Sequence, residues 1–68
     1  MADVMISYRI RHLREQHNIT QAELAKQLGI TRSSVNAWEM GISVPSTQYL
    51  VELANIFKVS TDYLLGLE

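Results

Sequence analysis

The chain has 68 residues, of which 47% are hydrophobic, and six Lys and Arg stand against seven Asp and Glu for a net charge of −1. A chain of this length forms one domain around one core, and the lack of cysteine excludes disulfides and thiolate metal sites. No continuous apolar run is long enough for a signal peptide or a membrane span, so the sequence predicts a soluble cytoplasmic protein.

Helical spacing of apolar residues runs through the whole sequence, and no segment alternates with period two as a strand would. The first stripe joins Ile6, Ile10, Leu13 and His17, and the fourth runs from Leu50 through Leu53 and Ala54 to Phe57. The predicted helices span roughly residues 5–17, 21–28, 32–40, 46–57 and 61–66. The predicted fold class is therefore all-α, a compact five-helix domain over residues 1–68.

Capping residues mark the ends of these helices. Thr20 and Glu23 fit a capping box, in which each side chain accepts a hydrogen bond from the other residue's backbone N–H. Gly29 and Gly41 stand where the second and third helices end, and glycine adopts the left-handed backbone of a helix end at little cost. Three further hydroxyls are predicted to cap the third, fourth and fifth helices: Thr31, Ser46 and Ser60.

The second and third helices are joined by a very short turn, which indicates a helix-turn-helix at about residues 21–40. Ala25 is small enough for a close helix crossing, and Gly29 supplies the positive φ of the turn. Val35 and Trp38, three residues apart, anchor the third helix to the core. This spacing is typical of DNA-binding helix-turn-helix pairs, although an ordinary helical hairpin would also fit these residues.

Several linked motifs resemble the Cro/repressor-like family, also called xenobiotic-response-element-type regulators. They are TQAELA at 20–25, LGIT at 28–31, WEMG at 38–41, PS at 45–46 and VSTDYLL at 59–65. The resemblance covers about residues 6–65 and implies a lambda-repressor-like fold that binds operator DNA as a dimer. Ala25, Gly29, Val35, Trp38 and Glu39 are then expected to be structural residues.

The outer face of the third helix carries the residues expected to contact bases. A helical wheel places Val35, Ser34 and Trp38 on the inner side, and the outer side holds Arg32, Ser33, Asn36, Ala37 and Met40. Arginine can read guanine, asparagine can read adenine bidentately, and alanine can touch a thymine methyl. The resemblance places the family's base-reading positions on Arg32, Ser33 and Ala37, with Asn36 beside them. A merely solvated helix face would have a similar composition.

Phosphate contacts are expected from residues around this helix. Gln21 opens the second helix, where free backbone N–H groups favour an anion, and the resemblance implies that its side chain grips a phosphate. The resemblance also implies that Arg14 touches phosphate and pairs with Glu39. The remaining expected contacts are Arg11, Thr20, Thr31 and Ser43.

The loop after Gly41 departs from the family pattern, because it has no lysine or arginine where many relatives do. Its residues 42–44 offer one hydroxyl, Ser43, and backbone amides. We therefore expect weaker non-specific affinity for DNA than in a basic relative.

Apolar residues at the carboxyl-terminal end predict a homodimer on a near-palindromic operator. Tyr63, Leu65 and Leu67 supply area that a short helix cannot bury entirely, whereas Leu64 is expected in the core beneath Phe57. These side chains could instead all close the core of a monomer.

Catalysis and metal binding are not indicated. His12 and His17 are five residues apart and do not share a helix face, and no catalytic triad, carboxylate pair or phosphate-cradling glycine loop is present. No cofactor, metal or catalytic residue is expected. The function predicted is a sequence-specific DNA-binding transcriptional regulator, a repressor, and the alternative is a protein-interaction module on the same fold, such as an antitoxin.

Overall fold

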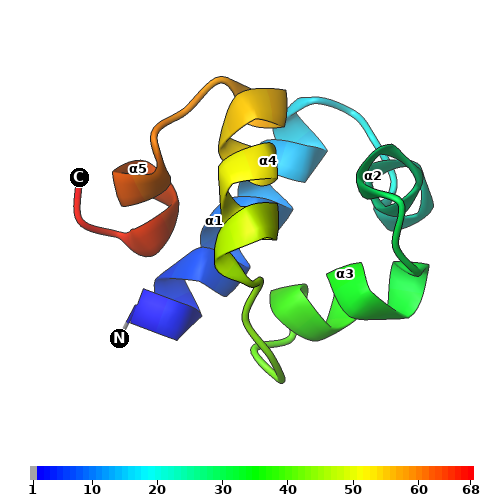
Figure 1. Ribbon diagram of the computed structural model, residues 1–68, viewed down its shortest axis with the longest axis horizontal. Helices are drawn as coiled ribbons and strands as arrows, with labels where there is room; N and C mark the ends of the chain where they lie inside the picture. The colour runs from blue at the N-terminus through cyan, green and yellow to red at the C-terminus, as the bar shows by residue number, and fades with distance from the viewer. Residues whose placement is uncertain (1) are drawn as a thin grey trace.

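The computed structural model describes the backbone of residues 2–68 and the side chains of residues 5–68. Residues 2–68 form five helices and no strand, which confirms the all-α class: α1 (Ala2–Gln16), α2 (Gln21–Leu28), α3 (Arg32–Glu39), α4 (Thr47–Phe57) and α5 (Thr61–Leu65) (Figure 1). The first helix begins at Ala2, earlier than expected, and the other ends differ from expectation by one residue at most.

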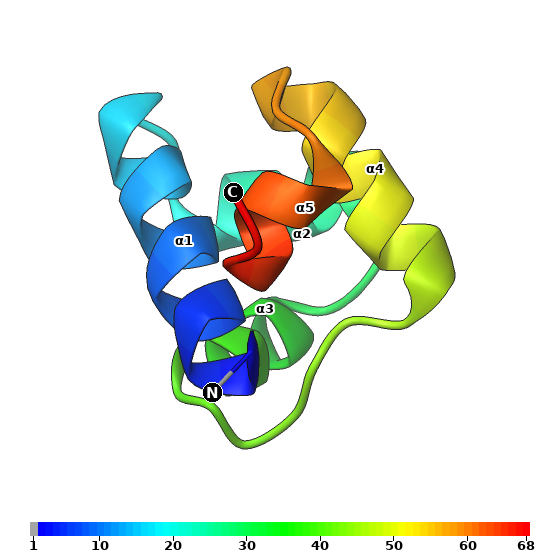
Figure 2. The same cartoon turned by 90° about the vertical axis from the view of Figure 1, so that its left-hand side faces the viewer.

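Every helix contributes to one core. Helix α5 lies between α1 and α4, while α3 crosses below them (Figure 2). The buried residues of this hydrophobic core are Ile6, Ile10, Leu13, Leu24, Ala25, Leu28, Val35, Trp38, Leu53, Ala54, Phe57 and Leu64. This confirms the core position expected for Leu64.

Two members of the predicted apolar stripes are less buried than expected. Leu50 is only partly buried. His17 is exposed, because it follows the end of α1. Its ring still lies edge-on to Phe57 with centroids 5.1 Å apart, and its Nδ1 is 2.8 Å from the Leu13 carbonyl oxygen.

Three of the four predicted caps are present. The Thr20 N–H donates to Glu23 Oε1 at 2.7 Å and the Glu23 N–H donates to Thr20 Oγ1 at 3.0 Å, which confirms the capping box. Thr31 Oγ1 accepts a hydrogen bond from the Ser34 N–H at the start of α3. Ser60 Oγ accepts one from the Tyr63 N–H at the start of α5. Ser46 occupies the N-cap position of α4, but its hydroxyl makes no capping hydrogen bond within the described chain.

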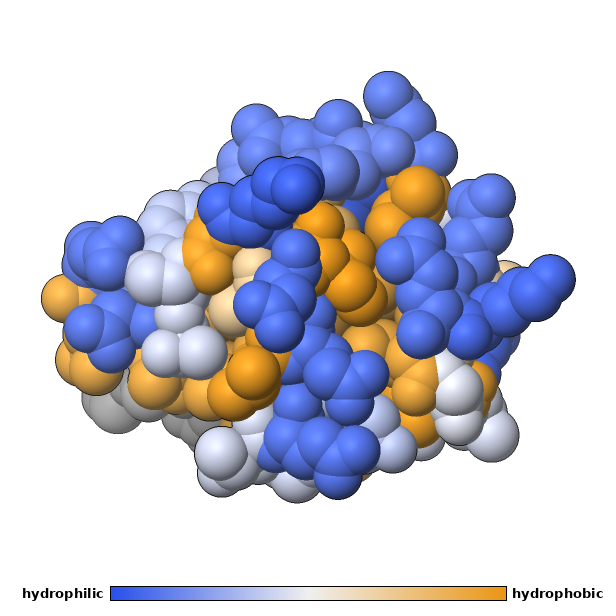
Figure 3. All heavy atoms as spheres, turned by 45° about the horizontal axis from the view of Figure 1, so that its top comes forward, coloured by the Kyte–Doolittle hydropathy of each residue, from blue (hydrophilic) through white to orange (hydrophobic). Residues whose placement is uncertain are grey.

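The face seen when the top of the molecule is turned forward is mixed in character. Hydrophilic side chains lie between smaller hydrophobic patches there (Figure 3). The exposed large hydrophobic residues of the chain include Met40, Ile42 and Val44, which lie at the end of α3 and in the loop that follows it.

Candidate nucleic-acid interface

The α2–α3 pair has the geometry of the predicted helix-turn-helix. Gly29 takes a φ of +71°, and the Ile30 N–H donates to the Ala25 carbonyl oxygen at 3.0 Å. Ala25 is buried in α2, which packs against α3, and its small side chain is compatible with a close approach of the two helices. The turn is therefore set by the two residues that the sequence singled out.

Helix α3 divides into two faces much as expected. Val35 and Trp38 are buried, whereas the predicted outer residues Arg32, Ser33 and Asn36 are exposed. Ala37 and Ser34 are half-buried, and the Ser34 hydroxyl lies 3.1 Å from Thr31 Oγ1. The exposed side of α3 thus presents one guanidinium, one hydroxyl and one amide to a ligand.

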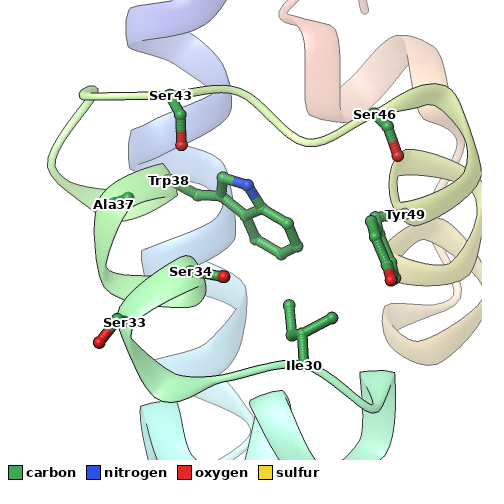
Figure 4. Close-up of a pocket in the computed structure, with 8 residues that line it drawn as sticks. All are labelled: Ile30, Ser33, Ser34, Ala37, Trp38, Ser43, Ser46 and Tyr49. Carbon is green, nitrogen blue, oxygen red and sulfur yellow. The ribbon is translucent and has the colours of Figure 1, made fainter.

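An open hollow of about 420 Å³ lies beside α3 (Figure 4). Its apolar part includes Trp38 and Tyr49, whose ring centroids are 5.9 Å apart. Ser34 of α3 turns its hydroxyl toward the hollow, Ser33 turns its hydroxyl away from it, and Ser43 and Ser46 lie along the loop that borders the opposite side (Figure 4). Sequence reasoning missed Ser46 and Tyr49 in this place, because only folding brings the start of α4 beside α3.

A hydrogen-bonded network links α1, α2 and α3. Arg14 donates to both carboxylate oxygens of Glu39, from Nε to Oε2 at 2.7 Å and from Nη2 to Oε1 at 3.0 Å, and Nη1 donates to the Ile19 carbonyl oxygen at 2.9 Å. Gln21 Nε2 donates to Glu39 Oε1 at 3.1 Å and to Asn36 Oδ1 at 3.2 Å. The predicted pairing of Arg14 with Glu39 is confirmed.

The Arg14–Glu39 ion pair at the inner end of this network is largely buried. The Arg14 and Glu39 side chains are 14% and 4% exposed, whereas Asn36 at the outer end is exposed. Hydrogen bonding to Glu39 raises the pKa of Arg14. The ion pair is therefore a fixed element that holds α1 against α3, with its polar extension reaching the surface.

A second, polar hollow of about 260 Å³ gathers several of the residues expected to contact DNA. Arg11, Arg14, Gln21 and Asn36 line it together with other side chains of α1 and α3. Arg11 also lies 3.4 Å from Glu15 in an ion pair whose side chains are 64% and 55% exposed, so solvent leaves this pair weak and Arg11 available. Thr31 and Ser43 do not line this hollow.

Among the carboxyl-terminal residues expected at a dimer interface, only Leu67 is strongly exposed, at 72%. Leu65 is half-buried. Tyr63 is half-buried beneath Arg9, whose Cζ lies 4.0 Å from the ring centroid and whose Nη1 donates to the Tyr63 carbonyl oxygen at 3.0 Å. Part of the Tyr63 surface is therefore already covered by Arg9 of the same chain.

Neither a metal site nor a membrane span is found in the described part of the chain. Among the side chains described, those of residues 5–68, there is no cluster of three or more His, Asp or Glu that could hold a metal ion. His12 instead stacks on Tyr8, with ring centroids 5.5 Å apart. Over the same residues, no helix combines the length and apolar character needed to cross a membrane.

Residues 10–64 match the family model described as helix-turn-helix. The chain is 41% identical over 63 residues to YobD, an uncharacterised HTH-type transcriptional regulator of Bacillus subtilis, covering 93% of this chain and 56% of YobD. It is 41% identical over 61 residues to YqaE of the same organism, an uncharacterised HTH-type transcriptional regulator, covering 90% of this chain and 53% of YqaE. The chain thus spans about half the length of these relatives.

A similar solved structure is the P22 c2 repressor protein in complex with a synthetic operator. It matches with a TM-score of 0.86 and 32% identity, over 93% of this chain and 96% of the repressor chain.

Proposed function

Because the chain belongs to the Cro/repressor-like helix-turn-helix family, we propose that it is a sequence-specific DNA-binding transcriptional regulator, a repressor, that acts in the cytoplasm by binding and not by catalysis. The observation that carries the proposal is the exposed polar face of α3, held at the end of a helix pair whose turn and packing are those of a DNA-binding helix-turn-helix. Selection of bound fragments from a genomic library, followed by gel shifts, tests it. Failure to retain any DNA in preference to bulk fragments would favour a protein-interaction module instead.

In this proposal α3 lies in the major groove and reads base edges. Arg32, the first residue of the helix, is exposed and can donate bidentately to guanine. Ser33 offers a hydroxyl, and Ala37 is short enough for the helix to lie close to a thymine methyl. Ser33 and Ala37 also line the hollow beside Trp38, so a base edge or methyl would have room there.

The start of α2 and the cationic side of α1 would position the helix on the phosphate backbone. The backbone N–H groups of Gln21 and Ala22 make no hydrogen bond within the described chain, because α2 begins at Gln21. The side chain of Thr20 caps the N–H of Glu23 instead. Free amides and the helix dipole together favour an anion. Arg11 adds an exposed positive charge next to them.

Replacing Arg32 by alanine should weaken binding to the cognate site by about 1–3 kcal/mol and relax the base preference at one position, because one bidentate contact is lost. Binding-site selection with quantitative titration measures both effects. Lys58→Asn is the matched control, because it also removes one positive charge and asparagine tolerates the left-handed backbone of this position. Lys58 caps the carboxyl-terminal end of α4, and that end of the helix lies away from α3 (Figure 1). Unchanged selectivity in Arg32→Ala would remove Arg32 from the base-reading set.

We also propose that two copies bind a near-palindromic operator, with two α3 helices about 34 Å apart in successive major grooves. In this proposal, the exposed cations that would neutralise phosphates in each copy are Arg11 and Arg32. A plot of the logarithm of the binding constant against the logarithm of the salt concentration should then have a slope of about −4 for a dimer and about −2 for a monomer.

Leu67→Gln tests the dimer surface, because Leu67 is 72% exposed and its loss leaves the core intact. We expect an unchanged melting temperature, a slope near the monomer value and weaker apparent binding. Changing the half-buried Leu65 to a polar residue should act in the same direction with some loss of stability. One subunit per half-site in sedimentation, with no effect of Leu67→Gln on the slope, would contradict the dimer and leave DNA binding standing.

A further inference from the structure

The buried ion pair fixes the orientation of the Gln21 side-chain amide. Both oxygens of the Glu39 carboxylate accept hydrogen bonds from Arg14, and a carboxylate held in this way can only accept. The end of the Gln21 amide that lies 3.1 Å from Glu39 Oε1 must therefore be its NH2 group. The reverse orientation would set the Gln21 carbonyl oxygen against the carboxylate.

The orientation of Gln21 in turn fixes that of Asn36. Gln21 Nε2 also lies 3.2 Å from Asn36, and since a donor needs an acceptor, the Asn36 atom facing it is Oδ1. The Asn36 carbonyl is thereby turned inward, and Nδ2 makes no hydrogen bond to the described part of the chain. The exposed Asn36 presents two N–H donors outward, into the polar hollow that it shares with Arg11.

On the basis of the proposed function, we propose that Asn36 contacts DNA only as a hydrogen-bond donor, through Nδ2, and that it does not read adenine bidentately. Bidentate recognition of adenine needs the amide oxygen and nitrogen side by side on the base, with Oδ1 accepting from N6 and Nδ2 donating to N7. Here Oδ1 points back to Gln21. Among the bases, guanine fits a donor-only amide best, because it offers two neighbouring acceptors, O6 and N7, whereas adenine N7 and thymine O4 are single acceptors; the other acceptor is a phosphate oxygen. This departs from the expectation that Asn36 reads adenine.

The test is binding-site selection with the full chain and with Asn36→Ala, followed by titration on the selected site. We expect roughly a tenfold loss of affinity, as for one hydrogen bond to a strong acceptor. If the acceptor is guanine, one guanine preference disappears. If it is a phosphate oxygen, affinity falls equally on all sequences and no base preference changes. An adenine preference that Asn36→Ala abolishes, or no change in affinity or selectivity, would overturn the inference.

Gln21→Leu tests whether Gln21 orients Asn36, because leucine removes the amide and keeps the backbone N–H. We expect Gln21→Leu and Asn36→Ala to lose less affinity together than the product of their separate losses, since Asn36 acts through the orientation that Gln21 imposes. If the affinity loss of the double variant equalled the product of the two separate losses, Gln21 would not act by orienting Asn36. Melting temperatures of all variants show that each is folded. If the wild type selects no DNA, the proposed function fails together with the inference; if it does, the outcomes above decide the inference alone.

Discussion

Replacing Trp38 by alanine should leave most of the protein unfolded. Trp38 is 5% exposed, belongs to the single core and packs its indole against Tyr49. Truncating a buried tryptophan costs about 3–5 kcal/mol, and a domain of this size has only about 5 kcal/mol of stability in total. Urea unfolding followed by circular dichroism measures the loss, and the midpoint should move close to zero denaturant.

Gln21→Ala is the contrasting variant, because Gln21 lies at the edge of the same helix pair but outside the core. It loses hydrogen bonds to Glu39 and Asn36, which costs about 1 kcal/mol, so the protein stays folded while DNA binding weakens. If Gln21→Ala unfolded the chain and Trp38→Ala kept DNA affinity, the assignment of buried and DNA-facing surfaces would be reversed.

The parts of the fold that sequence predicted well are set by neighbours along the chain. The Thr20–Glu23 capping box and the turn at Gly29 each depend on residues within a few positions, so their residue types are enough to predict them. Ser46 shows the limit of this reasoning. It has the residue type and position of a cap, yet its hydroxyl stands beside the hollow and makes no capping bond in the described chain.

The orientation of the site depends on contacts that no local pattern contains. The resemblance implied the Arg14–Glu39 pair, but the chain of bonds onward through Gln21 to Asn36 joins residues 15 to 18 positions apart. The helical wheel places the polar Asn36 on the outer face of its helix, but it does not say which end of the amide faces outward. Tyr63 is similar: its apolar area suggested a dimer contact, and folding places Arg9 over its ring.

Glu39→Gln should destabilise the protein by about 3 kcal/mol. The substitution keeps the size of the side chain but removes the negative charge opposite Arg14, whose side chain is only 14% exposed. Removing one partner of a buried ion pair leaves the other charge unpaired, which costs about 3–5 kcal/mol when burial is complete. We place this pair at the lower end because Arg14 keeps some contact with water. Urea unfolding at neutral pH gives the change in free energy.

The chain offers a matched control in Glu15→Gln, which makes the same change in the exposed pair with Arg11. Its cost should be at most about 1 kcal/mol, since water screens that pair. A second variant, Arg14→Met with Glu39→Leu, replaces both buried charges by apolar groups and should recover most of the stability that Glu39→Gln loses. The double variant also removes the acceptor that anchors Gln21, so it should fold yet bind DNA more weakly. Equal costs for Glu39→Gln and Glu15→Gln would mean that the buried pair contributes no more to folding than a solvated one.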